Sequence, residues 1–263
     1  MQSKTFFTFL LLISISCNTK SNNGAATAST YKIHLQQKEN INTYPSIAAI
    51  PLPAGYKKIE TISNSFAAWL QQVNLKKDKT VYLFNGDRKA NQSAQFAVLD
   101  ISTGDKDLQQ CADAVMRLRA EYLFAVKKYD SIFFTDNEGK SYHFTEPYNS
   151  SHLNTYLQTV FGMCGSASLS KQLHPADIKN IQVGDVLIRG GFPGHAMIVI
   201  EVAMNESGKK IFMLAQSYMP AQDIHVLLNP VNTNLSPWYD DTGETKIYRP
   251  EYVFAKNELK RWL

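Results

Sequence analysis

The chain has 263 residues, of which 44% are hydrophobic and 19% are charged, and its formal net charge is +4 at pH 7. Because this charge is small and dispersed, the sequence predicts no nucleic-acid partner. The six histidines lack the spacing of zinc ligands, and the chain has no glycine-rich phosphate loop and no Gly-x-Ser-x-Gly elbow, so we expect no metal and no cofactor.

Residues 1–16 have the pattern of an export signal. Lys4 is their only charged residue, and residues 6–15 are almost entirely apolar, which is too short for the ~20-residue span of a bilayer. The segment ISISC at residues 13–17 resembles a bacterial lipoprotein box, which implies that Cys17 becomes the lipidated first residue. An ordinary secretion signal that contains a cysteine is the alternative. We expect the lipid anchor, and with it a location in the cell envelope on a bacterial membrane.

The rest of the chain divides into a tether and one domain. Residues 17–44 are polar and rich in Ser, Thr, Asn and Gln, so we expect the lipidated Cys17 to be followed by a flexible linker. Residues 45–263 are numerous enough for a single domain with a real core. The sequence does not indicate an oligomeric state.

The first half of the domain predicts mixed elements. Residues 65–70 suggest a short helix, residues 81–84 a strand before an Asn-Gly turn, and residues 93–101 a second strand. Residues 107–126 form the strongest helix, with Asp107 as its cap, Gln110 in a capping box and one apolar stripe. The polar run at residues 88–92 could line a cleft or merely cap a turn.

The second half continues as hairpins and helices. Residues 131–134 and 141–145 predict a hairpin, and residues 150–162 and 166–173 predict two helices. Strands are expected at residues 185–189, 195–203, 211–218 and 224–228. The resulting layout is an α+β domain with an antiparallel sheet. Asp223 and His225 are expected to be an exposed pair.

His195 is the first candidate catalytic residue. It opens an apolar strand directly after a turn that is rich in Gly and Pro. Its imidazole titrates near neutral pH and must find a partner or reach solvent, so it can serve as a general base if a nucleophile lies nearby.

Cys111 is the candidate nucleophile. It lies near the start of the strongest helix on the inward face, where the helix N-terminus and a nearby imidazole would favour the thiolate. Two alternatives stay open: Cys111 is a small apolar member of the core, or it forms a disulfide with Cys164.

Three segments carry a resemblance to a known family. DLQQCADAVMRLRAEY at residues 107–122, GDVLIRGGFPGH at residues 184–195 and LAQSYMPAQD at residues 214–223 resemble the bacterial family called domain of unknown function 4846. The similarity covers about residue 51 to the C-terminus. It implies no established activity.

A more distant resemblance implies a mechanism. A cysteine on a helix, a later Gly-Asp-Val before a strand and a Gly-His that opens the next strand are similar to the NlpC/P60 papain-like cysteine peptidases and amidases. It implies a helix packed on an antiparallel sheet, with extra N-terminal strands and an inserted hairpin and helices. By this resemblance Cys111 is the nucleophile, His195 the base and Gln216 the residue that orients the imidazole. The sequence departs from the family around the cysteine, which lies about one turn into the predicted helix.

The strand register tests Gln216. If Ser207 and Gly208 form a two-residue turn, Gln216 pairs with Val199, on the same face as His195 but about 13 Å away at ~3.3 Å per residue. Only a bulge or a shifted register would bring Gln216 to the imidazole.

Two functions follow as hypotheses. The first is a membrane-anchored cysteine hydrolase that acts on an amide, peptide or ester of the cell envelope, with a cell-wall peptide as the expected substrate. The alternative is a non-catalytic envelope lipoprotein that uses the same fold to bind a partner or to act as a scaffold.

Overall fold

A computed structural model describes residues 40–241 and 245–263, which belong to one compact unit, Asn40–Leu263. The predicted export signal and the predicted lipidation of Cys17 lie outside the described residues. No helix in the described ranges is long and apolar enough to cross a bilayer.

The described residues form a mixed α+β domain in which the strands pair antiparallel, and the predicted α+β class is confirmed at this level. The helices are α1 (Phe66–Gln71), α2 (Cys111–Ala125), α3 (Ser150–Met163) and α4 (Ser166–Gln172). The strands of the first part are β1 (Tyr56–Lys58), β2 (Gln95–Val98), β3 (Phe133–Thr135), β4 (Ser141–His143), β5 (His174–Pro175) and β6 (Val186–Arg189). Those of the second part are β7 (His195–Asn205), β8 (Lys210–Gln216), β9 (His225–Leu227), β10 (Tyr239–Asp240), β11 (Lys246–Tyr248), β12 (Val253–Ala255) and β13 (Leu259–Arg261).

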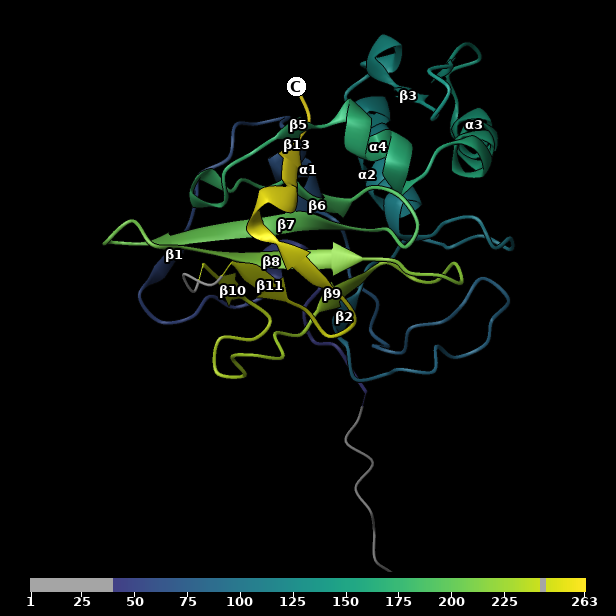
Figure 1. Ribbon diagram of the computed structural model, residues 1–263. Coiled ribbons are helices and arrows are strands. Elements are labelled where there is room, and N and C mark those ends of the chain that lie inside the picture. The colour runs from purple at the N-terminus through teal and green to yellow at the C-terminus, as the bar shows by residue number, and fades with distance from the viewer. Residues whose placement is uncertain (1–39, 242–244) are drawn as a thin grey trace, which may run out of the picture. The chain divides into compact units, whose positions relative to one another are not determined.

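The central sheet has the strand order β2-β9-β8-β7-β6-β13-β5, with β1 beside β7 and β10 beside β8. Its two long strands, β7 and β8, are almost entirely buried, and side chains alternate between its faces. One face carries Ala196, Ile198 and Ile200 and packs against α1 and α2. Helices therefore cover this face, as Figure 1 shows.

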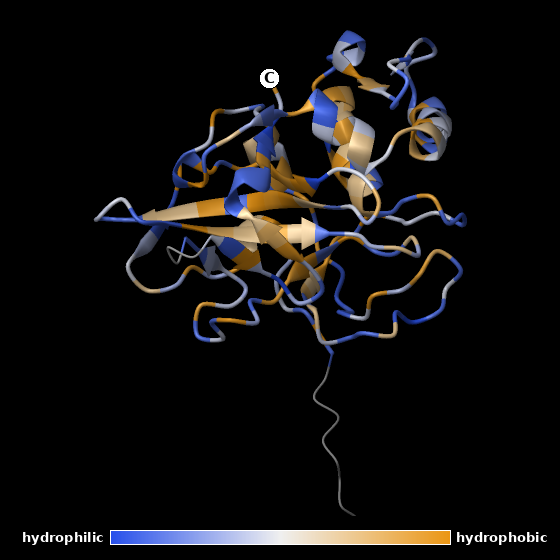
Figure 2. Cartoon of the chain, in the orientation of Figure 1, coloured by the Kyte–Doolittle hydropathy of each residue, from blue (hydrophilic) through white to orange (hydrophobic). Residues whose placement is uncertain are grey.

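The C-terminal segment covers the opposite face. Met197 and Val199 of β7 pack there with Ile247 of β11 and Phe254 of β12, which form their own hairpin. In Figure 1 this yellow segment crosses the front of β7 and β8, and Figure 2 shows the apolar strands enclosed between the two layers. The sheet is thus buried on both faces, and His195 lies on the face that the C-terminal hairpin covers.

Several predicted elements are confirmed and others are wrong. The hairpin β3–β4, the helices α3 and α4 and the four strands β6 to β9 occur near their predicted positions. Residues 81–84 do not form a strand, because a tight turn between Leu83 and Asp87 leaves only single bridges to other segments. The very short strands at both ends of the domain were not predicted.

The predicted start of α2 is also wrong. The helix begins at Cys111, with Gln110 as its N-cap and Asp113 as its third residue. The backbone N–H of Gln110 donates to Asp113 Oδ2 over 2.9 Å. Asp107 is not the cap, because its Oδ1 instead accepts the backbone N–H of Ala221 over 2.7 Å. The shift makes Cys111 the first residue of the helix.

Candidate active site

Two long-range contacts place Cys111 at the end of the central sheet. Besides the contact from Asp107 to the loop after β8, Ser217 Oγ lies 2.9 Å from the Gln109 carbonyl oxygen. The segment that precedes the helix is therefore docked on the loop that follows β8. Ala196 lies near the start of β7, two residues before Ile198, which pairs with Ala215 of β8. Its backbone N–H faces the Cys111 sulfur. The sulfur thus lies against the residue that follows His195.

The electrostatics around Cys111 favour a resting thiol. Burial raises the pKa of the Cys111 thiol and outweighs the N–H of Ala196, which acts in the opposite direction; Asp113 raises it further. Cys111 is nevertheless partly exposed, whereas Cys164 is buried, and both cysteines are free. The structure therefore contains no Cys111–Cys164 disulfide.

The His195 ring is held by Gln216. His195 Nε2 lies 2.8 Å from Gln216 Oε1, and the ring is only 2% exposed. An amide oxygen can only accept, so Nε2–H donates and Nδ1 carries the lone pair. Burial lowers the pKa of His195 to about 4, so the imidazole is neutral at neutral pH. No hydrogen bond between His195 and the Cys111 sulfur is found in the part of the chain that the structure describes.

Aromatic rings surround the imidazole. The ring centroids of Tyr218 and Tyr252 lie 4.7 Å and 4.8 Å from that of His195, and Phe254 follows at 6.0 Å. Burial raises the pKa of Tyr218, and the charges of Glu251 and Cys111 act in the same direction. Tyr218 is therefore close to the sulfur as well as to the imidazole.

Gln216 reaches His195 because the predicted register is wrong in two places. The β7–β8 turn encloses three residues between Asn205 and Lys209, not two, and this shifts the pairing by one residue. A bulge between Val199 and Glu201 shifts it by a second. Leu214 then pairs with Val199, so Gln216 moves two positions closer to the start of β7.

The expectation that Asp223 and His225 are exposed is wrong. Both are buried: Asp223 accepts from Lys76 Nζ at 2.8 Å and from the backbone N–H of Tyr82 at 2.9 Å. His225 is fully buried, and its Nε2 lies 3.4 Å from Gln216 Nε2. Burial lowers the pKa of His225 to about 4. His225 thus contacts Gln216, the residue that holds the His195 ring.

Sequence reasoning also missed an ion pair beside the site. Lys89 is buried and its Nζ lies 2.6 Å from Glu251 Oε2, which also accepts from Gln216 Nε2 at 2.7 Å. Burial lowers the pKa of Lys89, and Glu251 opposes this shift. The polar run at residues 88–92 could have indicated this ion pair, since a lysine among amide side chains directly before a strand suggests a buried acidic partner. Glu251 itself carried no local signal.

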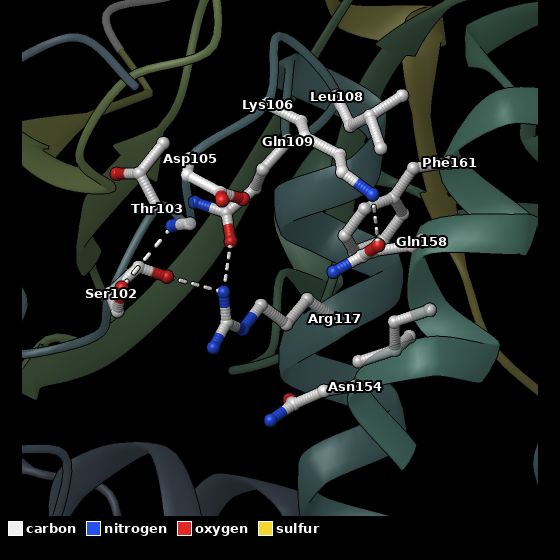
Figure 3. Close-up of a pocket in the computed structure, with 12 residues that line it drawn as sticks. Ser102, Thr103, Asp105, Lys106, Leu108, Gln109, Arg117, Asn154, Gln158 and Phe161 are labelled. Atoms are coloured by element: carbon white, nitrogen blue, oxygen red, sulfur yellow. Dashed lines mark hydrogen bonds between the residues drawn. The ribbon is translucent and has the colours of Figure 1, made fainter. Parts of the chain in front are cut away.

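A pocket of about 170 Å³ lies next to the segment that leads into Cys111, as Figure 3 shows. Its walls come from residues 102–109, α2 and α3. Arg117 donates to Gln109 Oε1 and to the Ser102 carbonyl oxygen, and Lys106 Nζ donates to Gln158 Oε1 over 2.9 Å. None of the three predicted catalytic residues lines this pocket, and its polar groups mainly brace the segment before the helix.

Among the described residues, no group of three or more His, Cys, Asp and Glu side chains could hold a metal ion. The groups with reactive chemistry at the site are the Cys111 thiol and the neutral His195 imidazole, which Gln216 holds.

Comparisons with known proteins identify a family whose description names no activity. The family model described as a domain of unknown function (4846) matches residues 47–151 and 144–261. No curated protein and no solved structure matches the chain.

Proposed function

Because the chain belongs to the family of the domain of unknown function 4846, whose description names no activity, we propose a function from the geometry of the site: a cysteine hydrolase that cleaves an amide, peptide or ester bond. The observation that carries the proposal is the position of Cys111. It is the first residue of a helix, and its sulfur faces the backbone N–H of Ala196, the residue that follows His195 in the chain. Gln216 holds the His195 ring through Nε2.

The proposed reaction begins from a neutral pair. As the Cys111 sulfur attacks the carbonyl carbon, its proton passes to Nδ1 of His195, and a C–S bond forms. The imidazolium then gives the proton to the leaving amine or alcohol as the C–N or C–O bond breaks. Water hydrolyses the resulting thioester, which releases the carboxylic acid and restores the thiol. Gln216 keeps the ring in the orientation that these transfers need.

The resemblance to the NlpC/P60 papain-like peptidases and amidases supports the same assignment. Cys111 at the helix start, His195 at the start of a strand and Gln216 on the neighbouring strand follow the order of that family. The corrected start of α2 removes one departure from the family, since Cys111 no longer lies one turn into the helix.

We also propose that the protein is exported and lipid-anchored at Cys17, with a cell-wall peptide or amide as substrate. This part is supported by the sequence of residues 1–17 alone. In cells, the wild-type protein should remain with the membrane fraction, and Cys17→Ala should be released from it. Equal membrane retention of both proteins would contradict the anchor.

A thiol-labelling experiment tests the catalytic proposal. The tryptic peptide of residues 107–117 contains Cys111 alone, so mass spectrometry of the full chain reports its alkylation by iodoacetamide separately from Cys17 and Cys164. If His195 accepts the thiol proton, wild-type Cys111 should react at pH 6–7 about 100-fold or more faster than in His195→Ala, as expected from the ~10²–10⁴-fold range of a positioned base. The advantage should be lost as the pH falls through about 4, where His195 becomes protonated.

A non-catalytic binding or scaffold lipoprotein is the second candidate. The observations that favour it are the burial of His195, which is 2% exposed, and the raised pKa of the Cys111 thiol. In that case Cys111 should react as an ordinary hindered thiol in both the wild-type protein and His195→Ala. That result would reject the hydrolase.

A further inference from the structure

A mostly buried carboxylate, that of Glu251, accepts a hydrogen bond from the amide that holds His195. Glu251 Oε2 accepts from Gln216 Nε2 over 2.7 Å and from Lys89 Nζ over 2.6 Å, while Glu251 Oε1 accepts from Asn91 Nδ2 over 3.0 Å. The side chains of Lys89 and Glu251 are 8% and 13% exposed. Because both carboxylate oxygens have donors and little contact with solvent, Glu251 is fixed as an acceptor beside Gln216.

His225 supplies a second acceptor for the same amide. Its Nδ1 lies 2.9 Å from the Asp223 carbonyl oxygen, which can only accept, so Nδ1 carries the proton. Its Nε2 is then unprotonated and faces Gln216 Nε2 at 3.4 Å. Gln216 thus has an acceptor for each hydrogen of its amide group, Glu251 for one and His225 for the other.

These two acceptors determine which way the Gln216 amide faces. With its NH₂ group bound to Glu251 and His225, Gln216 must present Oε1 to His195. A flipped amide would place Oε1 against the Glu251 carboxylate and would leave Gln216 Oε1 and His225 Nε2, both buried, without a donor, which is strongly unfavourable. The tautomer of His195, with Nε2 protonated and Nδ1 free, follows from this orientation.

We propose that Glu251, held by Lys89, and His225 are positioning residues that fix the amide of Gln216 and, through it, the His195 tautomer that has its lone pair on Nδ1. A role of Glu251 and His225 in catalysis rests on the proposed hydrolase. Their control of the His195 tautomer does not depend on it. Among the described residues, neither side chain is hydrogen-bonded to His195 or to the Cys111 sulfur, whereas both accept from the Gln216 amide.

The tautomer can be read directly. In the full chain labelled with ¹⁵N-histidine, the two ring nitrogens of His195 report which of them is protonated. The wild-type protein should show Nε2–H alone at pH 7. Glu251→Ala should show a mixture of tautomers, and Cys111 labelling should fall about 10-fold, a part of the contribution of a positioned base. Glu251→Gln retains a carbonyl acceptor without the charge and should restore most of the wild-type signal.

Asp240→Ala is the matched control. Asp240 accepts from Lys209 Nζ over 2.6 Å on β10, which pairs with the other end of β8, so this variant removes a comparable ion pair of the same sheet. It should change neither the His195 nitrogen shifts nor the labelling rate. If Glu251→Ala does not fold, the double variant Glu251→Gln, His225→Phe tests the orientation of the Gln216 amide without leaving a cavity. It should give the mixed His195 tautomers.

The outcomes separate the two proposals. A single unchanged tautomer and an unchanged labelling rate in folded Glu251→Ala, or in the Glu251→Gln, His225→Phe double variant, would overturn the positioning role while leaving the hydrolase intact. Equal labelling of the wild-type protein and His195→Ala would reject the hydrolase, and the nitrogen shifts would still decide whether Glu251 and His225 control the tautomer. A change in both measurements, confined to the Glu251 and His225 variants, supports the inference.

Discussion

Asp113 provides the most direct test of the electrostatics around Cys111. It is the third residue of α2, is almost fully buried and accepts the Gln110 N–H through Oδ2, whereas its Oδ1 has no partner among the described residues. Burial raises the pKa of Asp113 from 3.8 to about 8. The folded protein therefore holds a proton on Asp113 at neutral pH that the unfolded chain releases.

The sign of the pH dependence follows from this proton. Between about pH 4 and pH 8 the folded state binds more protons than the unfolded state at this residue, so the free energy of unfolding falls as the pH rises. The difference of about four pH units between the folded and unfolded pKa corresponds to about 6 kcal/mol at ~1.4 kcal/mol per unit. The contribution of Asp113 is complete below about pH 4 and is lost above about pH 8.

Asp113→Asn removes the titration and keeps the acceptor for Gln110. The buried NH₂ group of the asparagine lowers the free energy of unfolding by the same amount at every pH. The free energy of unfolding of the variant therefore lacks the pH dependence that Asp113 gives the wild type. Urea unfolding of both proteins from pH 4 to pH 9, followed by tryptophan fluorescence, measures the difference. We expect the advantage of the wild type to shrink by several kcal/mol over this range, up to the ~6 kcal/mol given by the pKa difference.

A control substitution and a clear refutation complete this test. Asp105→Asn changes an exposed carboxyl of the loop before the helix and should not alter the pH slope. If the stability difference between the wild type and Asp113→Asn stays constant from pH 4 to pH 9, or grows with pH, Asp113 does not hold a proton in the folded protein at neutral pH.

Two further predictions concern the turn before His195 and the cysteines. Gly194→Ala should destabilise the fold by at least ~1–3 kcal/mol, because a Cβ there would lie 2.3 Å from a backbone oxygen, whereas Gly162→Ala in α3 meets nothing within 4 Å and should leave the melting temperature equal or higher. Thermal melts of both variants check this, and a neutral Gly194→Ala would contradict it. Because Cys111 and Cys164 are free, a reductant should leave the melting temperature unchanged, and a clear drop would indicate the disulfide.

The pattern of the chain predicted the elements whose information is local. The helix α3, the hairpin β3–β4 and the strands β6 to β9 follow from apolar periodicity and turn residues, which act over a few positions. The family was also evident from three contiguous motifs. The segments β11, β12 and β13 have three residues each, too few for a periodic signal, and they exist because they pair or cover the sheet.

The candidate site shows where local reasoning stops. Asp107 has the features of a helix cap, but Ala221, more than one hundred residues away, takes its carboxylate. The loop of three residues and the bulge in β7 each moved the register by one, and only their sum brings Gln216 to His195. Gly208, with a positive φ, fits the loop of three residues, but Ser207 and Gly208 read equally well as a turn of two residues, and the bulge in β7 has no distinctive residue at its position.

By itself the sequence determined the α+β class, the family and the residue types of the proposed chemistry, because periodicity, turn residues and contiguous motifs are local properties. The tertiary structure decided the partners of those residues. It placed Cys111 at the first position of its helix and brought Gln216 within 2.8 Å of His195. It also brought Glu251 and His225 to the Gln216 amide, with Lys89 bound to Glu251. These contacts join distant segments, and each buried polar group must find its partner wherever the fold brings one within reach.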